Sequence, residues 1–153
     1  MKRAPSIVTI LAFLFLVRGS MAACNVSATG VNFGPYDAAA PTPRDSTGTV
    51  TVSCDQNPPT DIAIAIGVSG TSGVFIPRMM RNAARPDRLN YNLFTTPSRS
   101  TVWGDGTAGT STVFLRNVNR NRPQTATIYG RIPVGQDVAV GSYSDTLIVT
   151  ITP

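Results

Sequence analysis

The chain has 153 residues, of which 42% are hydrophobic and 14% are charged, and it contains 13 basic residues, 8 acidic residues and no histidine. Lys2 is its only lysine, and every acidic residue is an aspartate. General acid–base catalysis near neutral pH usually falls to His, Glu or Lys, and the common metal sites use clusters of His and Cys. The composition therefore argues against an enzyme and against a metal or other cofactor.

The first part of the chain, 1–22, has the pattern of a secretory signal peptide. Lys2 and Arg3 precede an apolar run, 7–17, and small residues follow that run. A membrane-spanning helix needs about 20 apolar residues, so this run is too short to be one. We expect the segment to be removed during export.

Removal of the signal peptide defines the mature chain. We expect cleavage after Ala22 or Ala23, which leaves a single domain, 23–153, without a transmembrane segment. Three basic residues leave with the signal peptide, so the remaining ten arginines and eight aspartates give a net charge of +2, which gives no reason to expect nucleic-acid binding. A rival interpretation makes Cys24 the acylated first residue of a lipoprotein, which would deprive Cys54 of a partner.

The mature chain opens with two segments that alternate in the manner of β-strands. In 24–33, Cys24, Val26 and Ala28 share one face, after which the alternation changes parity at Gly30. In 47–54, the valines and Cys54 share one face and hydroxyl residues fill the other. We expect these two strands to be neighbours.

The two cysteines are expected to form a disulfide. Each lies on the apolar face of its strand, and in an exported protein with two cysteines a bridge is the usual state. A bridge between Cys24 and Cys54 closes a loop of about 30 residues and would stabilise the fold by roughly 3–4 kcal/mol in the chain-entropy model. The alternative is a pair of buried free thiols.

Further segments with strand character follow, separated by turns rich in Gly, Pro, Asn and Asp. They are 61–69, a possible short strand 74–76, 89–93, 111–118, 125–132 and the final stretch 141–152. Seven or eight short strands without an amphipathic helix indicate an all-β protein, an antiparallel β-sandwich.

The final stretch is the one from which the functional hypothesis grows. Tyr143, Leu147, Val149 and Ile151 fall on one face, and only Ile148 breaks the alternation. No later segment follows to pair with this strand, so it lies at a sheet edge or pairs with another molecule. An exposed apolar edge is an aggregation hazard that a soluble protein has to cover.

Two features of the middle of the chain allow alternative interpretations. A basic patch, Arg78, Arg81, Arg85 and Arg88, is either a contact for an acidic partner or a solvated loop. The single tryptophan, Trp103, is either an exposed adhesive contact or the cap of a core.

Several motifs in order along the chain resemble those of one family. They are Cys24 followed by 31–36, then 48–54, the pair Arg78 and Met79, 89–93, 103–106, 129–132 and 141–145. Together they resemble the spore coat protein U domain family, the pilin-like subunits of archaic chaperone–usher systems. The resemblance covers essentially all of 24–153.

The resemblance implies an immunoglobulin-like sandwich that lacks its final strand. It implies export to the periplasm, capture by a periplasmic chaperone, passage through an outer-membrane usher, and completion by a strand from a sister pilin-like subunit at the cell surface. On this view Leu147, Val149 and Ile151 line a donor-strand groove, and 24–33 forms the opposite rim. At most Ala23 precedes Cys24 in the mature chain, so we expect an acceptor of a strand at a terminal position, not a donor.

Two classes of function follow from the sequence. The first is a structural or adhesive subunit of a surface pilus or spore-coat-like assembly, completed by donor-strand complementation. The alternative is an independent exported β-sandwich module that binds a ligand and is not assembled into a fibre.

Overall fold

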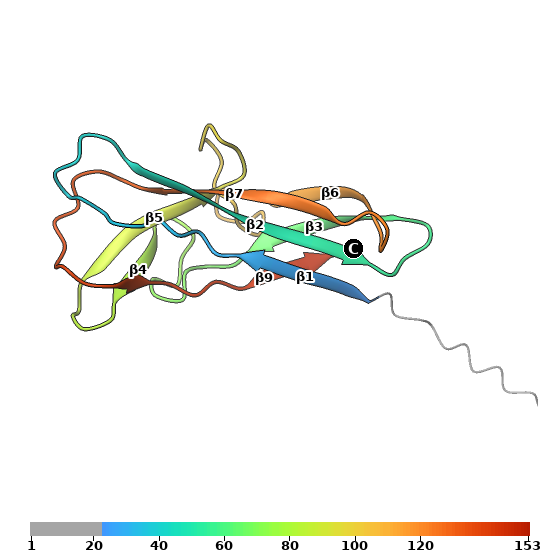
Figure 1. Ribbon diagram of the computed structural model, residues 1–153, viewed down its shortest axis with the longest axis horizontal. Coiled ribbons are helices and arrows are strands. Elements are labelled where there is room, and N and C mark those ends of the chain that lie inside the picture. Colours follow the sequence, from blue (N-terminus) through green and yellow to red (C-terminus); the bar gives the residue numbers. More distant parts are fainter. Residues whose placement is uncertain (1–22) are drawn as a thin grey trace, which may run out of the picture.

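The computed structural model describes residues 23–153, so the predicted signal peptide lies outside the described residues. Within this range, β-strands are the only regular secondary structure (Figure 1). They are β1 (Cys24–Thr29), β2 (Arg44–Cys54), β3 (Thr60–Ile66), β4 (Arg78–Asn82), β5 (Arg88–Phe94), β6 (Val113–Val118), β7 (Gln124–Ile132), β8 (Tyr143–Ser144) and β9 (Val149–Thr152). The prediction of an all-β protein is confirmed.

The strands form two antiparallel sheets. The larger sheet has the order β1-β2-β7-β5-β4-β8, and the smaller has the order β6-β3-β9. The free edges of the larger sheet are therefore β1 and β8, and one free edge of the smaller sheet is β9. In the view of Figure 1, β1 of the larger sheet and β9 of the smaller sheet are drawn on the same side of the molecule.

The core lies between the two sheets, and its composition follows from the alternation of the strands. Every second residue is buried from Gly48 to the end of β2, from Ile62 to the end of β3 and from Ala126 to the end of β7, as expected when one face of a strand meets the core. Ile62, Ile64 and Ile66 of β3 are at most 1% exposed. The smaller residues between them, Ala63 and Ala65, lie on the outer face. The predicted strands in these regions are confirmed.

Trp103 belongs to this core. Its side chain is 0% exposed, and its indole Nε1 donates a hydrogen bond of 2.9 Å to the carbonyl of Ile64. A buried indole needs such an acceptor for its N–H group. Of the two interpretations of the sequence, the structure supports the core and not an exposed adhesive contact.

The last stretch of the chain differs from the single predicted strand. The inward and outward alternation holds throughout, with Tyr143, Leu147 and Val149 half-buried and Ile148 exposed. However, β8 pairs with β4 in the larger sheet, whereas β9 pairs with β3 in the smaller sheet. The chain changes sheets between the two strands, so this stretch forms part of the edge of both.

One other expectation is wrong, and one alternating pattern does not reflect burial. The segment 74–76 forms a turn, and the strand in this region is β4, which begins at Arg78. Val26 and Ala28 of β1 are exposed although they share the face of Cys24, and Val26 is 42% exposed. β1 is the edge strand of the larger sheet, with a neighbouring strand on one side only.

Candidate functional site

A long apolar groove runs between the sheet edges and has a volume of about 1160 Å³. One rim is the segment 28–38, which begins at the end of β1, and the other is the segment 138–149, which includes β8 and ends at the first residue of β9. In Figure 1 these two segments run antiparallel to each other along the molecule. The groove therefore runs along the direction of the two segments that form its rims.

The floor of the groove consists of core side chains, which reach it from both sheets. They are Ile66, Met80, Leu89, Tyr91, Leu93, Ile128 and Ile132. Most are almost fully buried, with Leu89 at 3% and Tyr91 at 5% exposed. An occupant of the groove would thus contact the core of the domain directly.

The first rim is fixed by contacts to β2 and β7. Ser46 Oγ donates a hydrogen bond of 2.6 Å to the carbonyl of Asn32, and Phe33 is buried edge-on against Tyr91 with ring centroids 6.0 Å apart. Gly130 on β7 permits this approach, because a Cβ at that position would lie 2.8 Å from Cζ of Phe33. The glycine therefore lets the rim lie flat on the sheet.

The second rim is fixed by Asp145, which lies where the chain changes sheets. Its carboxylate accepts a hydrogen bond of 2.7 Å from the hydroxyl of Tyr91 and two of 3.1 Å from the amide and hydroxyl of Thr71. Backbone hydrogen bonds from Gly70 to Thr146 and from Gly67 to Ile148 continue the attachment. Burial and the bond to Asp145 raise the pKa of Tyr91, so its hydroxyl stays protonated and remains a donor.

Tyr36 of the first rim is bonded to the segment that precedes the second rim, at one end of the groove. Its hydroxyl donates a hydrogen bond of 3.0 Å to the carbonyl of Pro133 and accepts one of 2.9 Å from the amide of Gln136. The groove is therefore bounded at this end and continues between β1 and β9 toward the other.

Of the three predicted groove residues, Leu147, Val149 and Ile151, two lie where we expected them. Leu147 and Val149 line the groove. Ile151 is half-buried against the core in register with Ile64 and is not among the residues that line the groove. A charge at Ile151 would therefore disturb the core first. The rim residues Tyr36 and Asp145 were not predicted, although a carboxylate at an inward position of an alternating strand is a signal that could have identified Asp145.

The basic patch needs one correction. Arg78 is 0% exposed and lies inside the sandwich, so it is not part of a surface patch. Its guanidinium donates hydrogen bonds to the carbonyls of Ile66, Gly67 and Trp103 and to the side chain of Asn92. Burial lowers its pKa. An arginine side chain has five N–H donors, and those of Arg78 bond carbonyl groups of several different segments. The charge of the residue alone does not reveal this buried role, so the sequence placed Arg78 on the surface.

The other three arginines, Arg81, Arg85 and Arg88, are exposed on the hairpin between β4 and β5. They lie together at one end of the larger sheet. As a surface patch, the predicted set therefore consists of three residues, not four.

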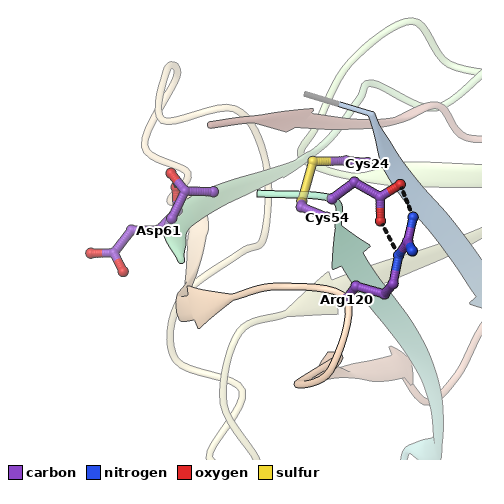
Figure 2. The surroundings of a disulfide bond; sticks show 6 residues. Cys24, Cys54, Asp61 and Arg120 are labelled. Carbon is purple, nitrogen blue, oxygen red and sulfur yellow. Dashed lines mark hydrogen bonds and ion pairs between the residues drawn. A yellow bond between two sulfur atoms is a disulfide. The ribbon is translucent and has the colours of Figure 1, made fainter. Parts of the chain in front are cut away.

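The predicted disulfide is present in the structure. Cys24 and Cys54 face each other in the register of β1 and β2 and are bonded (Figure 2). The amide of Asp55 donates a hydrogen bond of 2.9 Å to the carbonyl of Ala23, so the pairing extends beyond the bridge. Arg120 lies beside the bridge and forms a bidentate pair with Asp55. These contacts hold the start of the groove-forming strand to the rest of the sheet.

The part of the chain that the structure describes contains neither a cluster of metal-binding side chains nor a membrane-spanning helix. Across 23–153, no three His, Cys, Asp or Glu side chains gather in a way that would hold a metal ion. The same residues contain no helix long and apolar enough to cross a membrane.

Comparison with known proteins gives matches of two kinds. The family model of the Spore Coat Protein U domain matches residues 12–150. Protein U of Myxococcus xanthus is 35% identical over 130 residues, which cover 80% of this chain and 70% of that protein.

One matching solved structure is the CsuC–CsuE chaperone–tip adhesion subunit pre-assembly complex, from the archaic chaperone-usher Csu pili of Acinetobacter baumannii. A chain of this complex matches with a TM-score of 0.58 at 23% identity. The match covers 86% of this chain but only 39% of that one, and it shows the fold, an immunoglobulin-like β-sandwich. The Hda pilus minor tip subunit HdaB of E. coli matches with a TM-score of 0.39 at 14% identity, covering 83% of this chain and 79% of that one.

Proposed function

Because the chain belongs to the spore coat protein U domain family, we propose that it is an exported subunit of a surface pilus or coat, and that a strand of a partner protein fills its groove. Members of this family are structural and not enzymatic, so the chain is not an enzyme. The observation that carries the proposal is the apolar groove between two sheet edges.

The groove supports strand addition for two reasons. Within the described residues, the backbone N–H and C=O groups on the free sides of β1, β8 and β9 have no neighbouring strand, and an added strand would satisfy them. Apolar side chains from such a strand would cover Leu147 and Val149, and burial contributes roughly 1.5–3 kcal/mol for each side chain of this size. A strand with alternating apolar residues is therefore the occupant that fits.

The proposal includes the route and the place of assembly. The subunit would be exported, held in the periplasm by a chaperone that occupies the groove, and passed through an usher to a sister subunit at the cell surface. Export rests on the predicted signal peptide, which lies outside the described residues.

The terminal position expected from the sequence stays a prediction. It is tested by N-terminal sequencing of the mature chain together with electron microscopy of the purified subunit. Long fibres formed by this subunit alone would contradict it.

A pair of charge substitutions on β9 tests the groove. Val149 lines the groove, whereas Thr150 points to solvent on the same strand. The full chain, tagged and produced in its own cell, should co-purify with one partner per subunit when it is wild type or Thr150→Asp. Val149→Asp should still be exported but should lose the partner, since a carboxylate would be desolvated without compensation.

Hydrogen exchange locates the partner. In the wild-type complex the amides of 147–149 and of the first rim should exchange slowly, and the partner should contribute one protected extended segment. A wild-type subunit that is a stable monomer without any partner would reject this proposal and favour the independent binding module.

A further inference from the structure

The three exposed arginines of the β4–β5 hairpin are arranged as a concentrated positive charge. Arg81 of β4 and Arg88 of β5 face each other directly in the strand register, and Arg85 lies in the connecting turn. Like charges directly opposite each other destabilise a sheet. Such an arrangement calls for a compensating anion.

The described part of the chain supplies no carboxylate to this cluster. The ion pairs within 23–153 are made by other arginines, namely Arg99, Arg116, Arg120 and Arg131. Arg88 Nη1 donates a hydrogen bond to the carbonyl of Thr71 at 3.3 Å. The aspartate of the hairpin, Asp87, accepts a hydrogen bond of 3.2 Å from the amide of Ala139. Arg81 and Arg85 are left without a negative partner in this region.

A hollow of about 510 Å³ lies against these two arginines. Arg81, Arg85, Asn82 and Ser144 line it together with small apolar residues, and no carboxylate is among its lining residues. The side chain of Asn82 is 3% exposed, and its Oδ1 accepts hydrogen bonds from the amides of Ala84 and Arg85. Its Nδ2 is buried and has no hydrogen-bond partner among the described residues. Around the hollow, hydrogen-bond donors therefore outnumber hydrogen-bond acceptors.

Ser144 lines both the hollow and the groove, so the two sites meet at this residue. Ser144 lies on β8, an edge of the larger sheet, and pairs in register with Arg81, which in turn pairs with Arg88. A strand added to β8 would place one outward side chain in this same row, next to the small side chain of Ser144. The backbone of the added strand would lie two inter-strand spacings, about 10 Å, from that of Arg81. A long arginine side chain and an acidic side chain can span this gap together, because Ser144 between them is small.

We propose that the hollow binds a carboxylate of the partner strand, so that the strand that fills the groove carries Asp or Glu beside Ser144. This inference rests on the proposed function and adds a charge requirement to it. The apolar inward residues of the partner strand fill the groove, and the single outward acid fixes its register. Charge-assisted hydrogen bonds from the guanidinium groups of Arg81 and Arg85 make an acidic side chain bind more tightly at this place than a neutral one.

Peptide competition tests this requirement. The probes are peptides of about ten residues, the length of an ordinary strand, in which Val alternates with Thr. In each variant one Thr is replaced by Asp or by Lys. The mature chain is refolded from denaturant with an equimolar mixture of these peptides, and native mass spectrometry measures which peptide is retained.

The expected result is a roughly three- to tenfold enrichment of the peptide with Asp at one outward position near one end, relative to the Thr parent. Lys at that position should be depleted. The double variant Arg81→Gln, Arg85→Gln should retain the Thr parent but show no preference for Asp. Arg122→Gln, which changes an exposed arginine of another turn, should keep the preference.

Three results would overturn the inference and identify what failed. Retention of the Thr parent with no preferred Asp position, or a preference that persists in the double variant, rejects the carboxylate site while the groove stands. Retention of no peptide at all rejects the groove and this inference together. Binding of polygalacturonate that requires Arg81 and Arg85, without any Asp preference among peptides, assigns the hollow to a separate acidic polysaccharide instead.

Discussion

The hydroxyl of Tyr91, on the floor of the groove, donates a hydrogen bond of 2.7 Å to the carboxylate of Asp145, on its rim. Tyr91 comes from β5 of the larger sheet, and Asp145 lies where the chain leaves that sheet for the smaller one. The bond therefore fixes the rim relative to the core at the point where the backbone changes sheets.

Substitution of Asp145 should loosen this rim. Asp145→Ala leaves the buried hydroxyl of Tyr91 without its acceptor, and a buried polar group without a partner costs about 1–3 kcal/mol. We expect urea unfolding of the partner complex to show a loss in that range and faster release of the bound strand. Asp137→Ala, at an exposed position, is the matched control and should change neither. Equal effects of the two substitutions would show that Asp145 has no positioning role.

Removal of the disulfide should lower stability. The double variant Cys24→Ser, Cys54→Ser should be less stable than wild type by about 2–4 kcal/mol, because the unfolded chain regains the freedom of the open loop. Its yield in the periplasm should fall accordingly. Thiol titration of unfolded, non-reduced wild-type protein should find no free thiol, and two free thiols would refute the bridge.

Substitution of Arg78 should lower the stability of the fold, even when the new residue is also a cation. Lysine has a single ammonium group and cannot reach all the carbonyl groups that the buried guanidinium contacts. Each carbonyl left unpaired costs about 1–3 kcal/mol, so Arg78→Lys should lower the free energy of unfolding by at least about 2 kcal/mol. Arg81→Lys, on the exposed face of the same strand, should stay within about 0.5 kcal/mol of wild type. Similar losses for both variants would mean that burial of Arg78 is not what makes it essential.

The fold should lose stability in acid partly through Asp45. A hydrogen bond from Arg131, with the charges of Arg131 and Arg99, lowers the pKa of Asp45, while burial opposes this. Since the folded pKa lies below the value of about 3.9 in an unfolded chain, the contribution is present above that pH and is lost as the pH falls through the folded pKa. Its size should be under about 1 kcal/mol, because the side chain of Asp45 is 35% exposed.

Urea unfolding at pH 7 and pH 3 measures this contribution. Asp45→Asn should reduce the difference in unfolding free energy between the two pH values. Asp37→Asn, which changes an exposed loop carboxylate, should leave it as in wild type. An unchanged difference in Asp45→Asn would exclude these ion pairs as a source of acid sensitivity.

The strands that sequence predicted best are those whose alternation reflects burial directly. In β3, the isoleucines and alanines between Thr60 and Ile66 face opposite sides of one sheet, so a period of two is sufficient to identify the strand. The cysteines of β1 and β2 were placed on matching faces by the same argument, and the structure pairs them.

The features that sequence did not predict depend on contacts between distant segments. Arg78 reads as a surface residue because arginine is rarely buried, and its carbonyl partners lie on other segments of the fold. The last stretch keeps one alternation while its backbone moves from one sheet to the other, so periodicity gives no sign of the change at Asp145. The rim at Tyr36 depends on residues about 100 positions later in the chain, which local patterns do not reveal.

The position of the groove between sheet edges also has a mechanical consequence. A strand seated there would form hydrogen bonds along its length with an edge on each side. A force applied along the fibre would pull this strand parallel to its own axis and load all of these bonds at once, so none could open before the others. In the proposed assembly, the joint between subunits would then resist tension along the strand far better than it resists peeling from one end.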